Sequence, residues 1–264
     1  MMRIASLPRL LPRIIAFIAC VVGVLLAGPT LHAQLKPAKQ LFTRKNTFGF
    51  FFAYSNDSSH ILLGYAQNRK LLNIGASYSR RIWAGRVVNW QYNGEIMPVA
   101  LESDPVDHNV DTISPNLGIF GNNFGSFNSE PIGPCVPASY QLPPITIQGG
   151  TYTVTQTVTC TRRWVIGEGM MPVDFQWSFL PRHRLQPYLI GHGGYMYSTQ
   201  PIPTQDAGNF NFVFDFGAGF EMFRSRTQSI RVDYRYHHIS NHNTASENPG
   251  IDSGLAQITY SFGR

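Results

Sequence analysis

The stretch from Ser229 to Arg264 reads SIRVDYRYHHISNHNTASENPGIDSGLAQITYSFGR and alternates with a period of two. Successive side chains of a strand point to opposite faces, so this period separates two sets of residues. One face of the first segment carries Ile230, Val232, Tyr234, Tyr236, His238 and Ser240, and the other carries Arg231, Asp233, Arg235, His237 and Ile239. After a turn-rich interval the alternation resumes from Asp252 to Phe262. The pattern predicts two antiparallel strands, each with one mainly apolar and one mainly polar face.

The same alternation recurs through the chain. It predicts strands at about 70–82, 88–100, 164–180, 186–198, 209–223, 229–240 and 252–262, and one more between 47 and 67. Charged residues make up only 14% of the chain and aromatic residues 13%. An apolar exterior with aromatic girdles and a polar, filled interior fits this composition. We therefore expect an all-β fold, an eight-stranded antiparallel transmembrane β-barrel with a long surface loop.

Residues 1–33 have the features of a secretory signal peptide. Three arginines precede an apolar run from Ile14 to Leu26, and Leu31-His32-Ala33 offers a small-residue cleavage site. The alternative, an uncleaved anchor, would need an apolar run of roughly 20 residues. Removing this segment lowers the formal net charge from +6 to about +3, which is too mild to favour a nucleic-acid partner. Residues 34–264 are then one exported barrel domain, expected in a bacterial outer membrane.

The segment from Ser103 to Arg163 interrupts the alternation and is rich in Pro, Gly, Asn and Ser. We interpret it as a long surface loop inserted into the barrel. It holds Cys135 and Cys160, the only cysteines after residue 33, and an even pair in an exported chain favours a disulfide. A metal site is the alternative, but two thiols alone make a poor ligand set, so no metal is expected.

Three residues near the C-terminal end could perform ester hydrolysis. His238 and Ser240 lie two positions apart and share the apolar, outward face of their strand, and Asp252 begins the next strand. Facing residues of an antiparallel pair have Cβ atoms about 4.5–5.5 Å apart, so Asp252 could reach the imidazole. A nucleophile, a base and an orienting acid would then be together. Glu247 is a competing acid, and an interfacial histidine with no catalytic role is the simplest alternative for His238.

The segments His238-Ile239-Ser240-Asn241 and Asn248-Pro249-Gly250-Ile251-Asp252 resemble the PagL-type lipid A 3-O-deacylases of Gram-negative outer membranes. The resemblance implies that His238 is the base and Ser240 the nucleophile. Asp252 falls where the family carries its third triad member, which is a Glu in the best-known member. It also implies an oxyanion hole built with Asn241 and Asn248, and a reaction that needs no cofactor. The signal peptide and residues 103–163 have no counterpart in the family.

The expected function is therefore an outer-membrane serine esterase that removes an ester-linked acyl chain, at the 3-position, from the lipid A of lipopolysaccharide. One alternative is a non-enzymatic barrel whose surface loop binds or adheres. A phospholipase acting at the same membrane surface is another, because a catalytic triad alone does not separate the two lipid substrates.

Overall fold

A computed structural model describes residues 41–55, 57–115 and 123–264, and the expected signal peptide at residues 1–33 lies outside this part of the chain. No helix among the described residues is long and apolar enough to cross a membrane. The described residues form ten strands. These are β1 (Asn46–Ser55), β2 (Lys70–Ala84), β3 (Val88–Ser114), β4 (Asn123–Ser129), β5 (Ala138–Ile147), β6 (Gly150–Phe179), β7 (Leu185–Ser198), β8 (Phe210–Phe223), β9 (Gln228–Ser240) and β10 (Ile251–Gly263).

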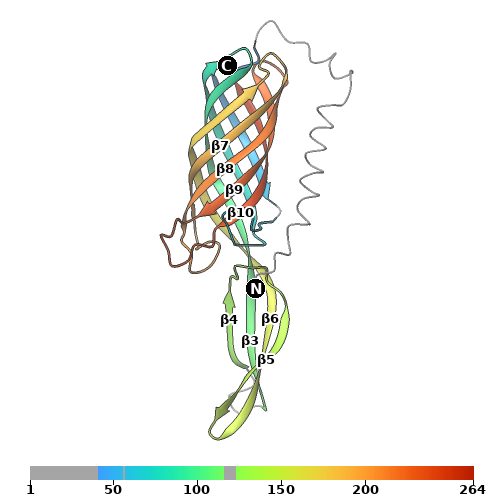
Figure 1. Ribbon diagram of the computed structural model, residues 1–264, viewed down its shortest axis with the longest axis vertical. Coiled ribbons are helices and arrows are strands. Elements are labelled where there is room, and N and C mark those ends of the chain that lie inside the picture. The colour runs from blue at the N-terminus through green and yellow to red at the C-terminus, as the bar shows by residue number, and fades with distance from the viewer. Residues whose placement is uncertain (1–40, 56, 116–122) are drawn as a thin grey trace, which may run out of the picture. The chain divides into compact units, whose positions relative to one another are not determined.

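Eight of these strands close into a barrel (Figure 1). Their order is β3-β2-β1-β10-β9-β8-β7-β6, and a further pairing of β3 with β6 completes the ring. Every pairing in the ring is antiparallel, including that of the first strand with the last, in which Phe50 faces Tyr260. The eight-stranded antiparallel barrel predicted from the alternation is confirmed.

The two faces of the strands differ as the sequence pattern predicts. On β9, Val232 and Tyr234 are 52% and 54% exposed on the outside, whereas Arg231 and Asp233 are buried inside. On β1 the outward residue Phe50 is 64% exposed. A closed barrel pairs its backbone groups between strands and leaves no edge, which is what hydrocarbon requires of a spanning segment. The apolar exterior therefore makes this a transmembrane β-barrel.

Ion pairs and hydrogen bonds fill the barrel interior. The Arg235 guanidinium contacts Glu95 at 3.1 Å and also Asp233, and Tyr188 donates to Asp233 at 2.5 Å. His192 lies 2.9 Å from Asp174. Buried charges are stable only when paired and hydrogen-bonded, so these residues act as structural filling in a barrel too narrow to be a pore.

The inserted segment differs from the irregular loop that the sequence analysis expects. β3 and β6 continue to pair beyond the barrel, from Asp104–Arg163 to Ser114–Thr153. β4 joins β3 and β5 joins β6, which gives a four-stranded sheet in the order β4-β3-β6-β5 (Figure 1). The run TYTVTQTVTCT in β6 explains the difference, because threonine, valine and tyrosine favour strands even where Pro and Gly are frequent nearby.

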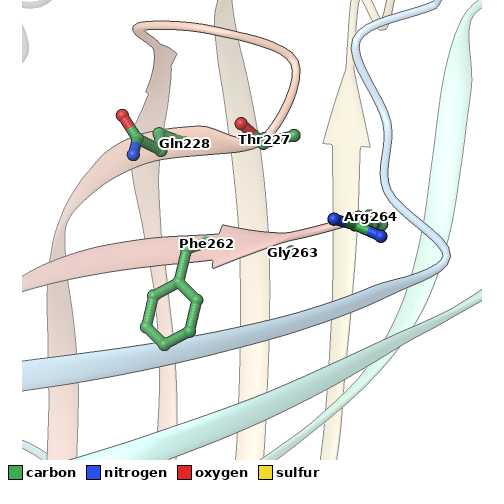
Figure 2. A pocket seen from close by; sticks show the side chains of 5 residues that line it. All are labelled: Thr227, Gln228, Phe262, Gly263 and Arg264. Atoms are coloured by element: carbon green, nitrogen blue, oxygen red, sulfur yellow. The ribbon is translucent and has the colours of Figure 1, made fainter.

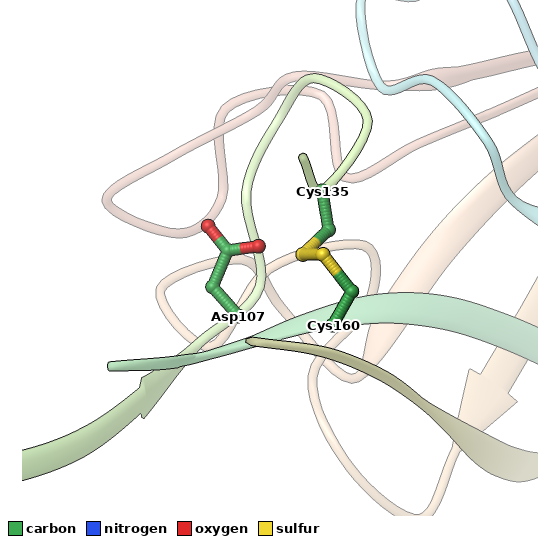
Figure 3. Close-up of side chains that lie close together, drawn as sticks. All are labelled: Asp107, Cys135 and Cys160. Atoms are coloured by element: carbon green, nitrogen blue, oxygen red, sulfur yellow. A yellow bond between two sulfur atoms is a disulfide. The ribbon is translucent and has the colours of Figure 1, made fainter. Parts of the chain in front are cut away.

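Cys135 and Cys160 form the expected disulfide, with their Cα atoms 5.8 Å apart. It ties the connection between β4 and β5 to β6. Figure 3 shows the Asp107 carboxylate beside the two bonded sulfur atoms, on the β3 position that faces Cys160. Sulfur atoms joined to each other are not thiolates, so this group of three residues does not provide the ligands that a metal ion needs.

Replacing both Cys135 and Cys160 by serine is expected to destabilise the four-stranded sheet and leave the barrel intact. The closed loop spans 25 residues, for which the chain-entropy relation gives about 3.5 kcal/mol. Limited proteolysis should cut residues 104–163 faster in the variant than in the oxidised wild type, and reduction of the wild type should reproduce the effect. Loss of the heat-modifiable barrel band on a gel would contradict this expectation.

The connections alternate between long and short around the ring. Residues 56–69, the β3–β6 insertion, residues 199–209 and residues 241–250 connect strands at one end, and short turns connect them at the other. Figure 1 shows the C-terminus at the short-turn end. A pocket at that end is lined by Thr227, Gln228, Phe262, Gly263 and Arg264 (Figure 2). It lies at the opposite end of β9 and β10 from His238 and Asp252, and it brings together no nucleophile, base and acid.

Candidate active site

The pairing of β9 with β10 brings His238 and Asp252 together at the end of the barrel that carries the long connections. The two residues are direct partners in the register. His238 Nδ1 lies 2.7 Å from Asp252 Oδ1, and the imidazole is 12% exposed whereas the carboxylate is fully buried. This hydrogen bond fixes the ring orientation. Because a carboxylate only accepts, Nδ1 carries the proton and Nε2 is left as the acceptor when the ring is neutral.

Asp252 receives three further hydrogen bonds. The backbone amides of Leu62 and Leu63 donate to Oδ2 at 2.6 and 2.8 Å. The Tyr236 hydroxyl donates to Oδ1 at 2.7 Å. Asp252 has the outward parity that the sequence predicts, but the connection between β1 and β2 covers it, so it does not face lipid directly. All four partners donate, which holds the carboxylate in one orientation toward His238.

Ser240 lies on the same outward face as His238, opposite Phe212 of β8. No hydrogen bond joins its Oγ to His238 within the described part of the chain. Two positions along a strand span about 6.6–6.8 Å, so Ser240 is the next residue after His238 on that face of β9. Catalytic hydrogen bonds in ligand-free proteins are often long and shorten when substrate binds.

Asn241 and Asn248 shape the connection that follows Ser240. The Asn241 backbone amide donates to Asn248 Oδ1 at 3.1 Å, and Asn241 Nδ2 donates to the Glu247 carbonyl at 2.6 Å. Asn241 Oδ1 accepts from the Asn243 amide at 2.9 Å. The Asn241 side chain is therefore engaged with the loop backbone. Among the described residues, no hydrogen bond involves Asn248 Nδ2, which is left as a donor in the connection that follows Ser240.

The competing acid, Glu247, does not contact His238. Its Oε2 accepts from the Thr204 hydroxyl at 3.0 Å and its amide donates to the Asp206 carbonyl at 3.2 Å. These bonds connect the loop after β9 with the loop after β7. The structure thus brings Asp252, rather than Glu247, to the imidazole.

Two other histidines flank the site in sequence. His237 points into the barrel and lies 2.5 Å from Asp215, while His242 is exposed in the loop. They do not converge with His238 on one point. Inside the barrel, Glu95, Asp174 and His192 place ligand-type atoms within 4.8 Å of one another. Arg235 Nη1 lies 2.7 Å from His192 Nδ1, so a guanidinium already balances these acids and the cluster is an ion-pair network.

Sequence reasoning missed two parts of this site. Tyr236 shares the outward parity of His238, and its ring lies parallel to the imidazole, with an angle of 4° and centroids 6.4 Å apart. The sequence could have indicated the contact of Tyr236 with Asp252, because residues of the same parity lie near each other across the strand pair. The amides of Leu62 and Leu63 carried no signal, because a backbone contact leaves no mark on residue type.

The fold and this cluster together define a class of protein: a transmembrane β-barrel whose outer rim carries a paired histidine and aspartate with a serine on the same face. The family model described as "Lipid A 3-O-deacylase (PagL)" matches residues 146–261, which include β6 to β9, β10 as far as Ser261, and all three of these residues. The resemblance to the PagL family expected from the sequence is confirmed over that range.

Comparison with solved structures gives similar barrels at low identity. The outer membrane enzyme PagL has a TM-score of 0.45 at 11% identity, covering 82% of this chain and 99% of that one. The outer membrane protein OprG from Pseudomonas aeruginosa has a TM-score of 0.38 at 10% identity, covering 85% and 100%. LpxR from Salmonella typhimurium has a TM-score of 0.25 at 8% identity, covering 83% and 100%. The search of curated proteins found no match.

Proposed function

We propose that the protein is an outer-membrane serine esterase that removes an ester-linked acyl chain, at the 3-position, from lipid A. The observation that carries this proposal is the 2.7 Å hydrogen bond between His238 and Asp252, with Ser240 beside them on the barrel's outward face. The site lies at the end of the barrel, on the face that contacts lipid, which is the depth at which the acyl esters of a membrane lipid lie. The family match over residues 146–261 supports lipid A as the substrate and the 3-position as the bond.

In this mechanism, His238 Nε2 takes the proton of the Ser240 hydroxyl as Oγ attacks the ester carbonyl. The tetrahedral intermediate collapses when the sugar oxygen leaves with the proton that Nε2 returns. Water, deprotonated by the same nitrogen, then attacks the acyl-serine and releases the fatty acid, which regenerates Ser240. Asp252 keeps Nδ1 protonated and stabilises the imidazolium during each proton transfer. The reaction needs no cofactor.

The oxyanion of the intermediate needs hydrogen-bond donors near Ser240, and we assign them to the loop held together by Asn241 and Asn248. Asn248 Nδ2 makes no hydrogen bond among the described residues, and the Asn241 backbone amide holds Asn248 by donating to its Oδ1. A donor of this type contributes about 2.7–4 kcal/mol to the transition state. Backbone amides close to Asn248 would complete the hole.

The proposed location follows from the same geometry. Residues 1–33 would direct export, and the barrel would insert with its short turns in the periplasm and its long connections outside. The site would then face the outer leaflet, where lipopolysaccharide is the lipid.

Mass spectrometry of lipid A tests the proposal. Cells that produce the protein are expected to contain lipid A lacking one hydroxyacyl chain, together with the free fatty acid, and the position of the missing chain follows from fragmentation. Unchanged lipid A with the folded barrel present would refute the proposal and favour a binding barrel. Loss of acyl chains from phospholipid instead would identify a phospholipase.

A further inference from the structure

The connection between β1 and β2 lies against the start of β10. The Ser59 amide donates to the Asp252 carbonyl at 3.1 Å, and the Tyr65 and Ala66 amides donate to the Pro249 and Gly250 carbonyls at 2.6 and 2.9 Å. Residues 59–66, called the strap below, are thus fixed at one end to the backbone of Asp252 and at the other to Pro249 and Gly250, which precede it.

Gly64 makes this close approach possible. A Cβ atom at this position would lie 2.6 Å from the Asp252 backbone nitrogen and 2.8 Å from the Ile251 carbonyl carbon, closer than carbon atoms pack. The turn is also held internally, because His60 Nδ1 lies 2.7 Å from the Gly64 carbonyl and the His60 ring stacks on Tyr65 at 4.7 Å. The strap is therefore a built structure, and the amides of Leu62 and Leu63 reach Asp252 because of it.

Four side chains of the strap are large, apolar and exposed. Leu62 and Leu63 are each 59% exposed, Tyr65 is 58% exposed and Ile61 is 39% exposed. Leaving such side chains in water forgoes roughly 1.5–3 kcal/mol for each one that could be buried. The strap overlies Asp252 on the outward side of β10, where the next exposed outward residue is Ala256, whose partner on β1 is Tyr54 at 37% exposure. The strap therefore borders the outward face of β1 and β10, which is the face that contacts hydrocarbon.

We propose that the strap binds the acyl chain of the ester being cleaved, with the Leu62 and Leu63 side chains on the hydrocarbon and their amides on Asp252. The inference rests on the proposed esterase and adds the residues that bind the acyl chain of the substrate. One element then performs two tasks, because the residues that contact the chain also hold the acid that orients His238. The strap favours a long, flexible hydrocarbon over a protein partner because it is short and borders the membrane-facing surface.

The test compares two esters of one alcohol, with a short and a long acyl chain, and the purified protein in detergent micelles. Leu62→Ser combined with Leu63→Ser keeps both backbone amides and removes the apolar side chains. The variant's kcat/KM on the long-chain ester is expected to fall roughly 10- to 100-fold, and much less on the short-chain ester, so the ratio of the two falls. Val87→Ser, at an exposed apolar residue of the short-turn end, should leave both values as in the wild type.

Other results separate the strap from the esterase. Equal losses on both esters would mean that the leucines only support Asp252, and no loss on either would mean that they touch no substrate; each result overturns the proposal. Activity on the two esters that persists in Ser240→Ala counts against the esterase itself, as does an inactive wild type.

Discussion

Ser240→Ala is expected to abolish acyl release while the barrel folds as in the wild type. Without Oγ no acyl-enzyme forms, and removal of a serine nucleophile from a triad costs about 10⁶-fold in kcat. Ser240 is the last residue of β9, and its half-buried side chain makes no hydrogen bond in the described part of the chain. Its replacement by alanine therefore leaves no buried partner unsatisfied.

The matched control is Ser246→Ala. Ser246 lies six positions further along, and its exposed hydroxyl donates to the Asp206 carbonyl at 2.9 Å without touching His238. Fatty-acid release from purified lipopolysaccharide, together with the heat-dependent gel shift of the barrel, measures activity and folding separately. An Ser240→Ala protein that releases fatty acid at a rate near the wild type would exclude Ser240 as the nucleophile.

The barrel could be predicted because its physics is local and periodic. On β8, Phe210, Phe212, Phe214 and Phe216 alternate with Asn211 and Asp215, and the structure exposes the first set and buries the second. A period of two is the direct consequence of strand geometry, and an apolar set on the outside has few explanations besides lipid. The number of barrel strands followed from the same pattern.

The inserted segment was harder to predict because its strands do not show the alternation of the barrel strands. Residues 104–114 and 150–163 pair with each other outside the barrel, where the strands lack the barrel's apolar exterior, so the alternation that marked the barrel strands is weak there. Pro and Gly dominated the prediction, although the threonine-rich run in β6 pairs readily. The register of a long hairpin depends on both strands together, and composition alone does not provide it.

One part of the candidate site could be predicted from the sequence and another part could not. His238 and Asp252 face each other across two neighbouring strands because of the parity and length of those strands. The sequence could therefore indicate this pair. The covering of Asp252 by the strap depends on a tertiary contact between residues about 190 positions apart, through backbone amides whose chemistry is the same for any residue except proline. Gly64 is the one trace of that contact in the sequence, and its reason appears only once the contact is known.

Asp252→Asn is expected to lower kcat about 10⁴-fold through the wrong tautomer of His238. The amides of Leu62 and Leu63 both point at one end of the side chain, so an asparagine must place its oxygen there. Its NH2 group then faces Nδ1, which has to accept, and the ring proton moves to Nε2. A protonated Nε2 in a neutral ring has no capacity to take the Ser240 proton. In the opposite orientation, the NH2 group of the asparagine would face the backbone amides of Leu62 and Leu63, so that donors face donors in a buried site. Each group left unpaired there costs about 1–3 kcal/mol.

Asp252→Glu separates charge from geometry, because it keeps a carboxylate and adds one methylene. It is expected to retain more activity than Asp252→Asn although it is the larger change in volume, since its oxygens accept from every donor around the site. Asp206→Asn is the matched control, because Asp206 is exposed in the connection at residues 199–209 of the same barrel end. Rates of fatty-acid release and the 15N chemical shifts of the His238 ring measure activity and tautomer independently. Full activity in Asp252→Asn, with Nδ1 still protonated, would show that the carboxylate serves only to anchor the strap.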